Sequence, residues 1–489
     1  MTPLSIAELM EKSGVAFGTS GARGLVSAMT DRVCYAYTAA FLQHLEQQHR
    51  VGLSKQVAIA GDLRSSTHRI VRAVATAVVD LGYVPVYCGR IPSPAVALFG
   101  LSERIPSIMV TGSHIPDDRN GIKFNSVEGE ILKQDEAAVR GAHVTLPDAF
   151  DALGMLRSPV EVHEDDRAAR AYVCRYTNAF PENLLDGMHL GLYAHSAVGR
   201  DLMQEIYESL GARVTRLGDS DVFIPVDTEA IRPEDVALAL RWTQEHGFDA
   251  MVSTDGDSDR PLISDECGRW LRGDVAGILC AKQLKADAVV TPVSSNSAVE
   301  ACGAFARVVR TRIGSPYVIE GMNSAVAEGG RCVVGYEANG GFLTASAIKV
   351  FKGFLDPLPT RDAVIVHLAI LSAARDAGCK VSKLLADLPP RFTWSDRLQA
   401  FPTEAGRGRL LALQQAGFAM IADVFRAFGS VSNVDFTDGM RVTFACGSVL
   451  HIRASGNAPE LRCYTEGSTE EQARDWNRKA MQLLETWRP

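Results

Sequence analysis

The sequence predicts an α/β protein of several domains, in which one strand–turn–helix–strand unit occurs three times and a smaller α+β domain follows. Its length of 489 residues by itself predicts about three or four domains. A hydrophobic fraction of 46% with 22% charged residues is ordinary for a globular protein and argues against a disordered chain. Strands and helices alternate along most of the chain, and the pattern changes only near the C-terminus.

The three copies share a pattern rather than particular residues. Each has a short apolar strand, a polar turn, a helix and a second strand, over 57–88, 190–217 and 288–309. Gly82 and Gly211 stand just past the helix in the first two copies, where a left-handed residue ends a helix. Strands that alternate with helices are typical of mostly parallel sheets covered by helices.

The C-terminal segment has a different pattern. A helix-like run over 405–428 precedes two alternating strands, 440–444 and 448–453, which a glycine-containing turn joins into a hairpin. A final amphipathic helix is expected from about residue 470 to 487, because Ser468-Thr469-Glu470-Glu471 is typical of a helix start. These elements predict a separate α+β domain.

Charge and cysteine content exclude several classes of protein. The net charge of −8 argues against a general nucleic-acid binder. The ten cysteines are scattered with no Cys-x-x-Cys pair, which argues against zinc and for reduced cysteines. The N-terminus has no signal-peptide pattern, and the longest apolar stretch, 363–374, is too short to span a bilayer. We therefore expect a cytoplasmic protein that binds neither nucleic acid nor membrane.

The strongest chemical pattern is Asp255-Gly256-Asp257-Ser258-Asp259-Arg260. Three alternating carboxylates can converge on one side of an extended loop. Oxygen-only ligands favour Mg²⁺ over zinc or copper. A calcium EF-hand is disfavoured, because its sixth position needs glycine and here holds Arg260, and because 248–253 has the pattern of a strand. A solvated acidic turn is the remaining alternative.

A second pattern places Ser113 and His114 just after the apolar strand 108–110, with Lys123 downstream. Ligands bind beyond the carboxyl ends of strands in open α/β sheets. Ser113 is therefore a candidate phosphoryl carrier. The alternative is a serine that caps a turn, with a histidine beside it.

Three weaker motifs complete the set. Two arginines at one loop can clasp a phosphate through paired donors, although a polar hairpin loop is the simpler interpretation; the residues concerned are Arg453, Ser455, Asn457 and Arg462. Glu337 and Asn339, in a glycine-rich loop, suit neighbouring sugar hydroxyls. The N-terminal motif 17–24, which contains Arg23, lacks the Lys-[Ser/Thr] ending of a P-loop.

Taken in order, these five motifs resemble the α-D-phosphohexomutase superfamily, and in kind most closely its phosphomannomutase/phosphoglucomutase members. The resemblance covers essentially the whole chain. It implies three related α/β domains with mixed sheets around a central cleft, plus a C-terminal α+β domain. The expected ranges are 1–165 with the phosphoserine loop, 166–267 with the metal loop, 268–386 with the sugar-binding loop and 387–489 with the phosphate-binding loop.

The resemblance also implies roles for individual residues. Ser113 would be phosphorylated, and one Mg²⁺ per chain would be held by a phosphoserine oxygen and by Asp255, Asp257 and Asp259. A hexose 1,6-bisphosphate would be both intermediate and activator. Lys123 would be the general base, His114 and Arg260 would lie beside the phosphoserine, and Arg23 would belong to the cleft.

Substrate contacts follow from the same resemblance. Glu337 and Asn339 would bind two sugar hydroxyls, and the non-reacting phosphate would be held by Arg453, Ser455, Asn457 and Arg462. The partner is a small sugar phosphate, and the chain is expected to be a monomer or a weak homodimer.

The sequence departs from the family pattern in the sugar loop. Asn339 stands where serine is usual, and Gly341 stands where relatives have a histidine that is a candidate acid or base. Further departures are Gly112, Ile115, Ala454 and Asn457, where Ala, Asn, Pro and Thr are usual. What replaces the histidine, and which hexose is preferred, are left open.

The expected function is a phosphohexomutase that interconverts hexose 1-phosphate and hexose 6-phosphate, with phosphomannomutase as the leading choice and glucose phosphates as further substrates. Phosphoglucosamine mutase is the alternative within the family. The alternatives outside it are a Mg²⁺-dependent phosphatase with Asp255 as nucleophile and a non-catalytic sugar-phosphate sensor.

Overall fold

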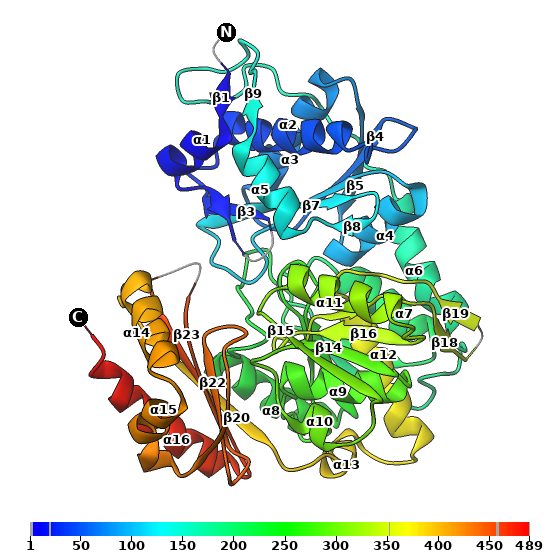
Figure 1. Cartoon of the computed structure of the whole chain (residues 1–489). Coiled ribbons are helices and arrows are strands. Elements are labelled where there is room, and N and C mark those ends of the chain that lie inside the picture. The colour runs from blue at the N-terminus through cyan, green and yellow to red at the C-terminus, as the bar shows by residue number, and fades with distance from the viewer. Residues whose placement is uncertain (1–2, 19–20, 352, 456–458, 489) are drawn as a thin grey trace.

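The computed structural model describes residues 3–18, 21–351, 353–455 and 459–488. Figure 1 shows a blue-to-cyan N-terminal part at the top, a green-to-yellow central part, and an orange-to-red C-terminal part at the lower left. Four main sheets build the molecule, and two short two-stranded sheets, β1–β9 and β18–β19, accompany them among the described residues. The architecture is mixed α/β, as expected from the sequence.

The first sheet has the strand order β2-β3-β7-β6-β4-β5, with β8 paired to β7. Its strands are β2 (Ala16–Phe17), β3 (Ala22–Leu25), β4 (Gln56–Gly61), β5 (Val84–Arg90), β6 (Ser107–Val110), β7 (Arg119–Ser126) and β8 (Gly129–Glu130). Its helices are α1 (Ile6–Ser13), α2 (Asp31–Gln47), α3 (Thr67–Asp80), α4 (Ser93–Glu103) and α5 (Lys133–Gly141). The short strands β1 (Leu4–Ser5) and β9 (His143–Val144) pair beside it.

The second and third sheets are smaller. The second has the order β11-β10-β12-β13, and its strands are β10 (His189–Tyr193), β11 (Arg213–Leu217), β12 (Ala250–Thr254) and β13 (Pro261–Ile263). The third has the order β15-β14-β16-β17, and its strands are β14 (Ala288–Pro292), β15 (Arg307–Thr311), β16 (Val333–Tyr336) and β17 (Phe342–Thr344). The hairpin of β18 (Ile348–Val350) and β19 (Gly353–Leu355) follows.

One four-strand pattern recurs in the first three sheets, which confirms the threefold repeat. The orders β5-β4-β6-β7, β11-β10-β12-β13 and β15-β14-β16-β17 each contain three parallel strands followed by an antiparallel one. The antiparallel strand makes the sheets mixed. It arises because a short loop turns the chain straight back after the third strand, whereas a parallel neighbour would need a longer crossover.

The repeat's helices differ in length. The first copy has α3, and the second has α7 (Arg200–Ser209), close to the expected ends. The third has only α10 (Ala298–Ala301), which ends short of the expected residue 305. Gly303, with φ +62, follows it and continues the turn into β15.

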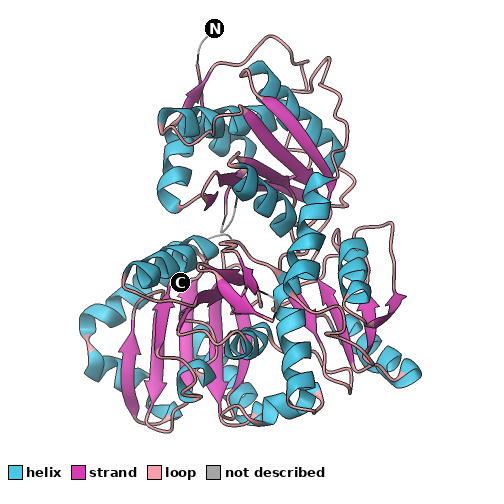
Figure 2. Cartoon of the chain, turned by 90° about the vertical axis from the view of Figure 1, so that its right-hand side faces the viewer, coloured by secondary structure: helices cyan, strands magenta, loops and turns pink. Residues whose placement is uncertain are grey.

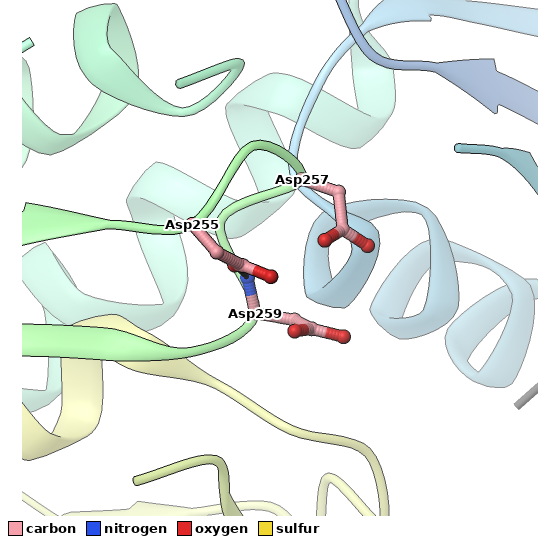
Figure 3. A group of neighbouring side chains, drawn as sticks. All are labelled: Asp255, Asp257 and Asp259. Carbon is pink, nitrogen blue, oxygen red and sulfur yellow. Dashed lines mark hydrogen bonds between the residues drawn. The ribbon is translucent and has the colours of Figure 1, made fainter. Parts of the chain in front are cut away.

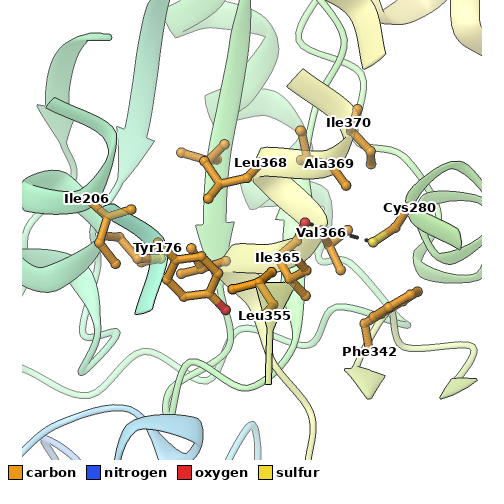
Figure 4. Packing of buried hydrophobic residues seen from close by; sticks show 14 of the residues in the cluster. Tyr176, Ile206, Cys280, Phe342, Leu355, Ile365, Val366, Leu368, Ala369 and Ile370 are labelled. Atoms are coloured by element: carbon orange, nitrogen blue, oxygen red, sulfur yellow. Dashed lines mark hydrogen bonds between the residues drawn. The ribbon is translucent and has the colours of Figure 1, made fainter. Parts of the chain in front are cut away.

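A single apolar core joins the central part of the molecule. It contains residues of α6 (Arg167–Ala179), α7, α9 (Gly273–Gln283) and α12 (Ala363–Asp376), and it extends to the face of the first sheet covered by α4. Figure 4 shows side chains of α12, among them Ile365 and Leu368, between Tyr176 and Ile206 on one side and Cys280 and Phe342 on the other. The second and third sheets therefore share one packed interior.

Two of the remaining helices cover the outer faces of these sheets. They are α8 (Pro233–His246) on the second sheet and α11 (Ser315–Ala327) on the third, while α13 (Val381–Ala386) packs against α12. Within the described part of the chain, no helix is both long and apolar enough to cross a membrane. The apolar stretch 363–374 belongs to α12 and is buried. All ten cysteines lie in the described ranges and are unbridged.

The fourth sheet is antiparallel, with the order β20-β24-β23-β22-β21. Its strands are β20 (Phe392–Leu398), β21 (Val431–Asp435), β22 (Met440–Phe444), β23 (Val449–Ala454) and β24 (Leu461–Gly467). Figure 2 shows these strands side by side at the lower left, with helices packed against them. The expected hairpin is β22–β23, and the expected last helix is α16 (Glu470–Glu485), capped by Thr469.

The run 405–428 is not one helix. It forms α14 (Thr403–Ala416), α15 (Phe418–Val424) and a short 3-10 turn, Arg426–Phe428. Gly417 separates the two helices with φ +83, a conformation that interrupts an α-helix. The four main sheets fall within the four ranges expected from the sequence, and the boundaries at 165, 267 and 386 stay predictions.

Candidate active site

Three loops occupy the same position in the three repeated sheets. The serine loop (111–118) joins β6 to β7, the metal loop (255–260) joins β12 to β13, and the sugar loop (337–341) joins β16 to β17. Each follows the third parallel strand at its carboxyl end, where α/β sheets bind ligands. The threefold repeat therefore explains why the main chemical motifs occur at these three places.

Each loop contains a residue in the left-handed region: Ser113 with φ +58, Ser258 with φ +56 and Gly340 with φ +88. Such a conformation is uncommon for residues other than glycine, and it persists only where the surroundings hold it. The Ser113 amide donates to Thr111 Oγ1 at 2.8 Å, and the Ser113 carbonyl accepts from Arg64 Nη2 at 2.9 Å. These two bonds hold Ser113 in its strained conformation.

The serine and metal loops are in direct contact. Ser113 is fully buried, and its Oγ donates to Asp255 Oδ2 at 2.6 Å. A Cβ atom added at Gly256 would lie 2.8 Å from the Ser113 carbonyl oxygen, so only glycine permits this approach. The predicted phosphoryl carrier, Ser113, therefore contacts the predicted metal ligand Asp255, although the two residues are 142 positions apart in the sequence.

Asp255, Asp257 and Asp259 form one buried carboxylate cluster. One oxygen from each lies within 4.8 Å of the others. Figure 3 shows the three side chains projecting from the same loop. Oδ1 of Asp257 and Oδ1 of Asp259 are buried and accept no hydrogen bond from the described residues. Buried anionic oxygens without donors suit a hard cation, so the cluster fits Mg²⁺.

Burial and neighbouring charges shift the pKa values of the three carboxyl groups in different directions. Burial, and then the charges of Asp257 and Asp259, raise the pKa of Asp255 well above its usual range. Burial also disfavours ionisation of Asp257, but Lys123 outweighs it and holds the pKa of Asp257 below its usual range. For Asp259, burial is outweighed by Arg361, and its pKa is lowered too. The repulsion among the three carboxylates therefore disfavours ionisation mainly at Asp255.

Lys123 reaches the cluster from β7. Its Nζ donates to Asp257 Oδ2 at 2.5 Å and to Asp259 Oδ2 at 2.6 Å. Ser93, at the start of α4, also donates to Asp257 Oδ2, at 2.5 Å. The predicted base is therefore next to the predicted metal ligands, where it acts as a hydrogen-bond donor.

His114 and Arg260 are neighbours across the two loops. Arg260 Nη1 lies 2.9 Å from His114 Nδ1, and Ser113 Oγ lies 3.4 Å from the same nitrogen. Burial and the Arg260 charge lower the pKa of His114 to about 3, which keeps the imidazole neutral. Arg23, on β3, lies near Arg260: burial and then Arg260 lower its pKa to about 10.

The sugar loop is also buried around its two predicted residues. Glu337 is 3% exposed, and its backbone amide donates to the Gly341 carbonyl at 3.0 Å. Asn339 turns its side-chain oxygen inward to accept from the Gly341 amide at 2.9 Å, and its own carbonyl accepts from Thr228 Oγ1 at 2.7 Å. The Asn339 oxygen is thus used to shape the loop.

The phosphate loop (453–459) begins at the end of β23. Arg453 Nη1 donates to Asp438 Oδ2 at 3.3 Å, and the same oxygen accepts from the backbone amide of Ile313, beside the third sheet, at 3.0 Å. Arg462 Nη2 donates to Glu460 Oε2 at 3.2 Å, and Ser455 is buried. Asn457 lies outside the described residues. Arg453 and Arg462 pair with acidic residues in this structure.

Sequence reasoning missed two buried arginines that hold these loops. Arg64 pairs with Asp62 at 3.1 Å and donates to four backbone carbonyl groups of the serine-loop region. Arg361 pairs with Asp259 at 3.0 Å and with Glu337 at 3.2 Å. Neither arginine belongs to a local sequence motif. The loop residues that they contact are distant in the sequence, so no local pattern marks them.

Comparison with known proteins agrees with this geometry. Models of the phosphoglucomutase/phosphomannomutase family match 14–143 as its alpha/beta/alpha domain I, 272–392 as its alpha/beta/alpha domain III and 409–482 as its C-terminal domain. The chain belongs to the phosphoglucomutase/phosphomannomutase family. It is an enzyme of the isomerase type, and the resemblance seen in the sequence is confirmed.

Individual relatives fit the same assignment. A phosphomannomutase of Salmonella muenchen is 42% identical over 470 residues, covering 95% of this chain and 95% of the relative. A phosphoglucosamine mutase of Pelobacter propionicus is 26% identical over 487 residues, covering 96% and 97%. The crystal structure of a putative phosphomannomutase from Thermus thermophilus has a similar fold, with a TM-score of 0.74, 19% identity and coverage of 96% and 99%.

Proposed function

We propose that this protein interconverts hexose 1-phosphate and hexose 6-phosphate, with Ser113 as the phosphoryl carrier and mannose phosphates as its main substrates. One observation carries the proposal: the buried Ser113 Oγ donates at 2.6 Å to Asp255, within a cluster of three carboxylates that fits Mg²⁺. A serine that merely capped a turn would not need a strained backbone, a second loop packed against it and an anionic partner.

Ser113 both gives and accepts the phosphoryl group in this scheme. In the first transfer, the bond from phosphorus to Ser113 Oγ breaks while a bond to the free sugar hydroxyl forms, which yields hexose 1,6-bisphosphate. The bisphosphate then turns around and returns its other phosphate to Ser113 Oγ. One phosphoryl group leaves and one arrives in each cycle, so Ser113 ends phosphorylated as it began.

The surrounding residues manage protons and charge. Lys123 takes the proton of the attacking hydroxyl, for which its Nζ must first leave Asp257 and Asp259 as a neutral amine. His114 and Arg260 lie beside Ser113, where the guanidinium offsets negative charge on the transferring group. Asp255, Asp257, Asp259 and a phosphoserine oxygen would hold Mg²⁺, which supplies positive charge to the transferring phosphoryl oxygens.

The substrate contacts must work for both orientations of the sugar. Glu337, which Arg361 links to Asp259 of the metal loop, would bind the hydroxyls that stay in place when the two ends of the sugar exchange. Asn339 would contribute its side-chain amide, since its oxygen is bound to Gly341. Arg453, Ser455, Asn457 and Arg462 would hold the phosphate that is not reacting.

Mannose phosphate is supported by the relatives. The relative named phosphomannomutase is 42% identical over nearly the whole chain, whereas the phosphoglucosamine mutase is 26% identical. Turnover of mannose, glucose and glucosamine phosphates should be compared with a trace of hexose 1,6-bisphosphate present. We expect the highest kcat/KM for mannose phosphate and a lower value for glucose phosphate. Turnover of glucosamine phosphate alone would contradict the choice of sugar.

A Ser113→Ala variant separates the mutase from the alternatives outside the family. The mutase should lose nearly all activity, while a phosphatase that uses Asp255 as nucleophile would keep hydrolysing sugar phosphate. A sensor would bind sugar phosphate and would not turn it over even with Ser113 phosphorylated and Mg²⁺ present. The cytoplasmic location and the monomeric or weakly dimeric state stay predictions, which cell fractionation and light scattering would test.

A further inference from the structure

Arg361 occupies the space in which a side chain at position 341 would lie. A Cβ atom added at Gly341 would be 2.5 Å from Arg361 Cδ and 2.7 Å from Arg361 Cγ. The next atom, Asn339 Oδ1, would be 3.1 Å away, and Gly341 is not among the glycines with a positive φ. Arg361, rather than backbone conformation, is therefore what requires glycine at 341.

The arginine links residues from all three repeated sheets. Arg361 Nε donates to Asp259 Oδ2 at 3.0 Å, and Nη1 donates to Glu337 Oε2 and Ser315 Oγ, each at 3.2 Å. Ser315 Oγ in turn donates to Glu130 Oε1 at 2.8 Å. Asp259 belongs to the metal loop, Glu337 to the sugar loop and Glu130 to the first sheet. A forked guanidinium suits this kind of bridge better than a lysine does.

Its own position is fixed by the next residue. Asp362 caps α12 through Val364, and its carboxylate accepts from the hydroxyls of Tyr172 and Tyr176 on α6. Arg361 is only 1% exposed. Burial lowers its pKa, but the charges of Asp259, Glu130 and Glu337 outweigh burial and raise it well above its usual range. A fixed, permanently charged group thus lies between the two loops.

We propose that Arg361 is a positioning residue: its side chain fills the space beside Gly341 and holds Glu337 and Asp259 in register, so that one guanidinium bridges the sugar loop and the metal loop. The inference rests on the proposed function for the identity of the sugar ligand. The bridge has two opposite consequences. It orients Glu337 toward the substrate, and it competes with Mg²⁺ for Asp259.

The first test removes the cation. Arg361→Met should weaken sugar-phosphate binding at least tenfold, because Glu337 loses its partner, and should tighten Mg²⁺ binding several-fold, because a competing cation is gone. Arg361→Lys keeps the charge but lacks the forked guanidinium, so both of its affinities should lie between those of the native protein and those of Arg361→Met. Both affinities are measured by calorimetry, with mannose 6-phosphate and MgCl₂ as probes, in a Ser113→Ala background that prevents turnover.

Opposite shifts in the two affinities are the decisive readout, since a merely structural defect would weaken both. Arg69→Gln is the matched control, because Arg69 also bonds a buried aspartate, Asp31, at 2.6 Å, but lies outside the site. It should leave both affinities unchanged. If Arg361→Met leaves the two affinities unchanged, or lowers both together, the proposal is wrong.

The second test changes the two side chains that would compete for the same space, at positions 341 and 361. In the native background, Gly341→Ala should lower sugar-phosphate affinity about tenfold, because its methyl group collides with the Arg361 side chain. In an Arg361→Ala background the same change should have less than about a twofold effect. Gly341→His should likewise be harmful with Arg361 present and should restore affinity when Arg361 is alanine. Equal effects in both backgrounds would overturn the proposal.

These readouts separate the inference from the proposed function. Mg²⁺ affinity and the free energy of unfolding of the four Gly341 and Arg361 combinations need no catalysis. If the native chain shows no mutase activity while the opposite shifts and the background dependence are observed, the proposed function fails and the positioning role of Arg361 stands.

Discussion

Ser113 combines burial, a left-handed backbone and a hydrogen bond to Asp255, and each of these depends on residues far away in the sequence. The sequence predicted Ser113 as a candidate because it follows an apolar strand and precedes a histidine. The strained conformation could not be predicted, since the bond from Arg64 that helps to hold it joins residues 49 positions apart and forms only in the fold. The strain places Oγ against the carboxylate cluster.

Contacts between single residues explain two of the departures from the family pattern. Gly112 and Gly341 each replace a larger residue, and each lies against a buried arginine. A Cβ atom at Gly112 would be 2.7 Å from Arg64 Cζ, and one at Gly341 would be 2.5 Å from Arg361 Cδ. The departures were visible in the sequence, but the arginines that explain them belong to no local pattern.

Asp255→Asn should stabilise the protein when Mg²⁺ is absent. The folded state raises the pKa of Asp255 above its unfolded value, so its ionised form opposes folding as pH rises through the folded pKa. Asparagine removes this repulsion, for an expected gain of about 1 kcal/mol or more in the free energy of unfolding at pH 7. The gain should vanish below the ordinary pKa of a carboxyl group, where both proteins are neutral at this position.

The same variant should lose stabilisation by Mg²⁺. In the native protein, Mg²⁺ at about 100 times its Kd adds about 2.7 kcal/mol to the free energy of unfolding. Denaturant titrations with MgCl₂ and with EDTA measure both effects, and Asp265→Asn is a matched control at a buried aspartate outside the cluster. A native protein whose stability does not respond to Mg²⁺ would argue against the metal site.

At the scale of elements, the position of the three loops explains the order of the motifs. Each loop follows the third parallel strand of a repeat, so the same topology delivers a serine, three carboxylates and a glutamate to one region. The strands and the helices of the first two copies were predictable from apolar runs and terminal glycines. The antiparallel fourth strands were not, because periodicity does not determine strand direction, and α14 and α15 are divided at Gly417 for a conformational reason.

Arg64→Gln should destabilise the protein and disturb the serine loop. Arg64 and Asp62 form a fully buried ion pair, and removing one partner of such a pair costs about 3–5 kcal/mol. The serine loop also loses four carbonyl contacts, so kcat should fall about 100-fold through misplacement of Ser113. Urea denaturation and steady-state kinetics measure the two effects.

The control is Arg72→Gln on α3, the helix that begins just after Arg64. Arg72 bonds Glu161 but is partly exposed, and an exposed pair contributes less than about 1 kcal/mol. Its stability and kcat should stay close to the native values. Equal losses in the two variants would show that Arg64 has no special relation to the serine loop.

At the scale of the whole molecule, the second and third sheets share one apolar core while the fourth sheet is attached through polar contacts. Glu466 on β24 accepts hydrogen bonds from the amide and hydroxyl of Ser297, and Arg312 donates to the Thr437 carbonyl at 3.2 Å. A cavity of about 20 Å³, lined by Ala338 beside Glu337 and by Tyr464, lies at this junction. No sequence pattern predicts such contacts.

Glu466→Ala should loosen the fourth sheet without disturbing the metal cluster. It removes two hydrogen bonds to Ser297, and a loss of about 1.4 kcal/mol corresponds to a tenfold increase in KM for sugar phosphate. Mg²⁺ affinity should not change. Glu485→Ala, on the exposed end of α16, is the control and should affect neither. An unchanged KM for Glu466→Ala would mean that this contact does not position the phosphate loop.

The phosphoryl-carrier role of Ser113 is tested most directly by intact-mass spectrometry before and after incubation with hexose 1,6-bisphosphate and MgCl₂. We predict a mass gain of one phosphate on the dephosphorylated protein, transfer of that phosphate to added hexose phosphate, and no gain at all in Ser113→Ala. A native protein that stays unphosphorylated under all conditions, or a Ser113→Ala variant that gains the same phosphate, would contradict the assignment of Ser113 as the group that gives and accepts phosphate.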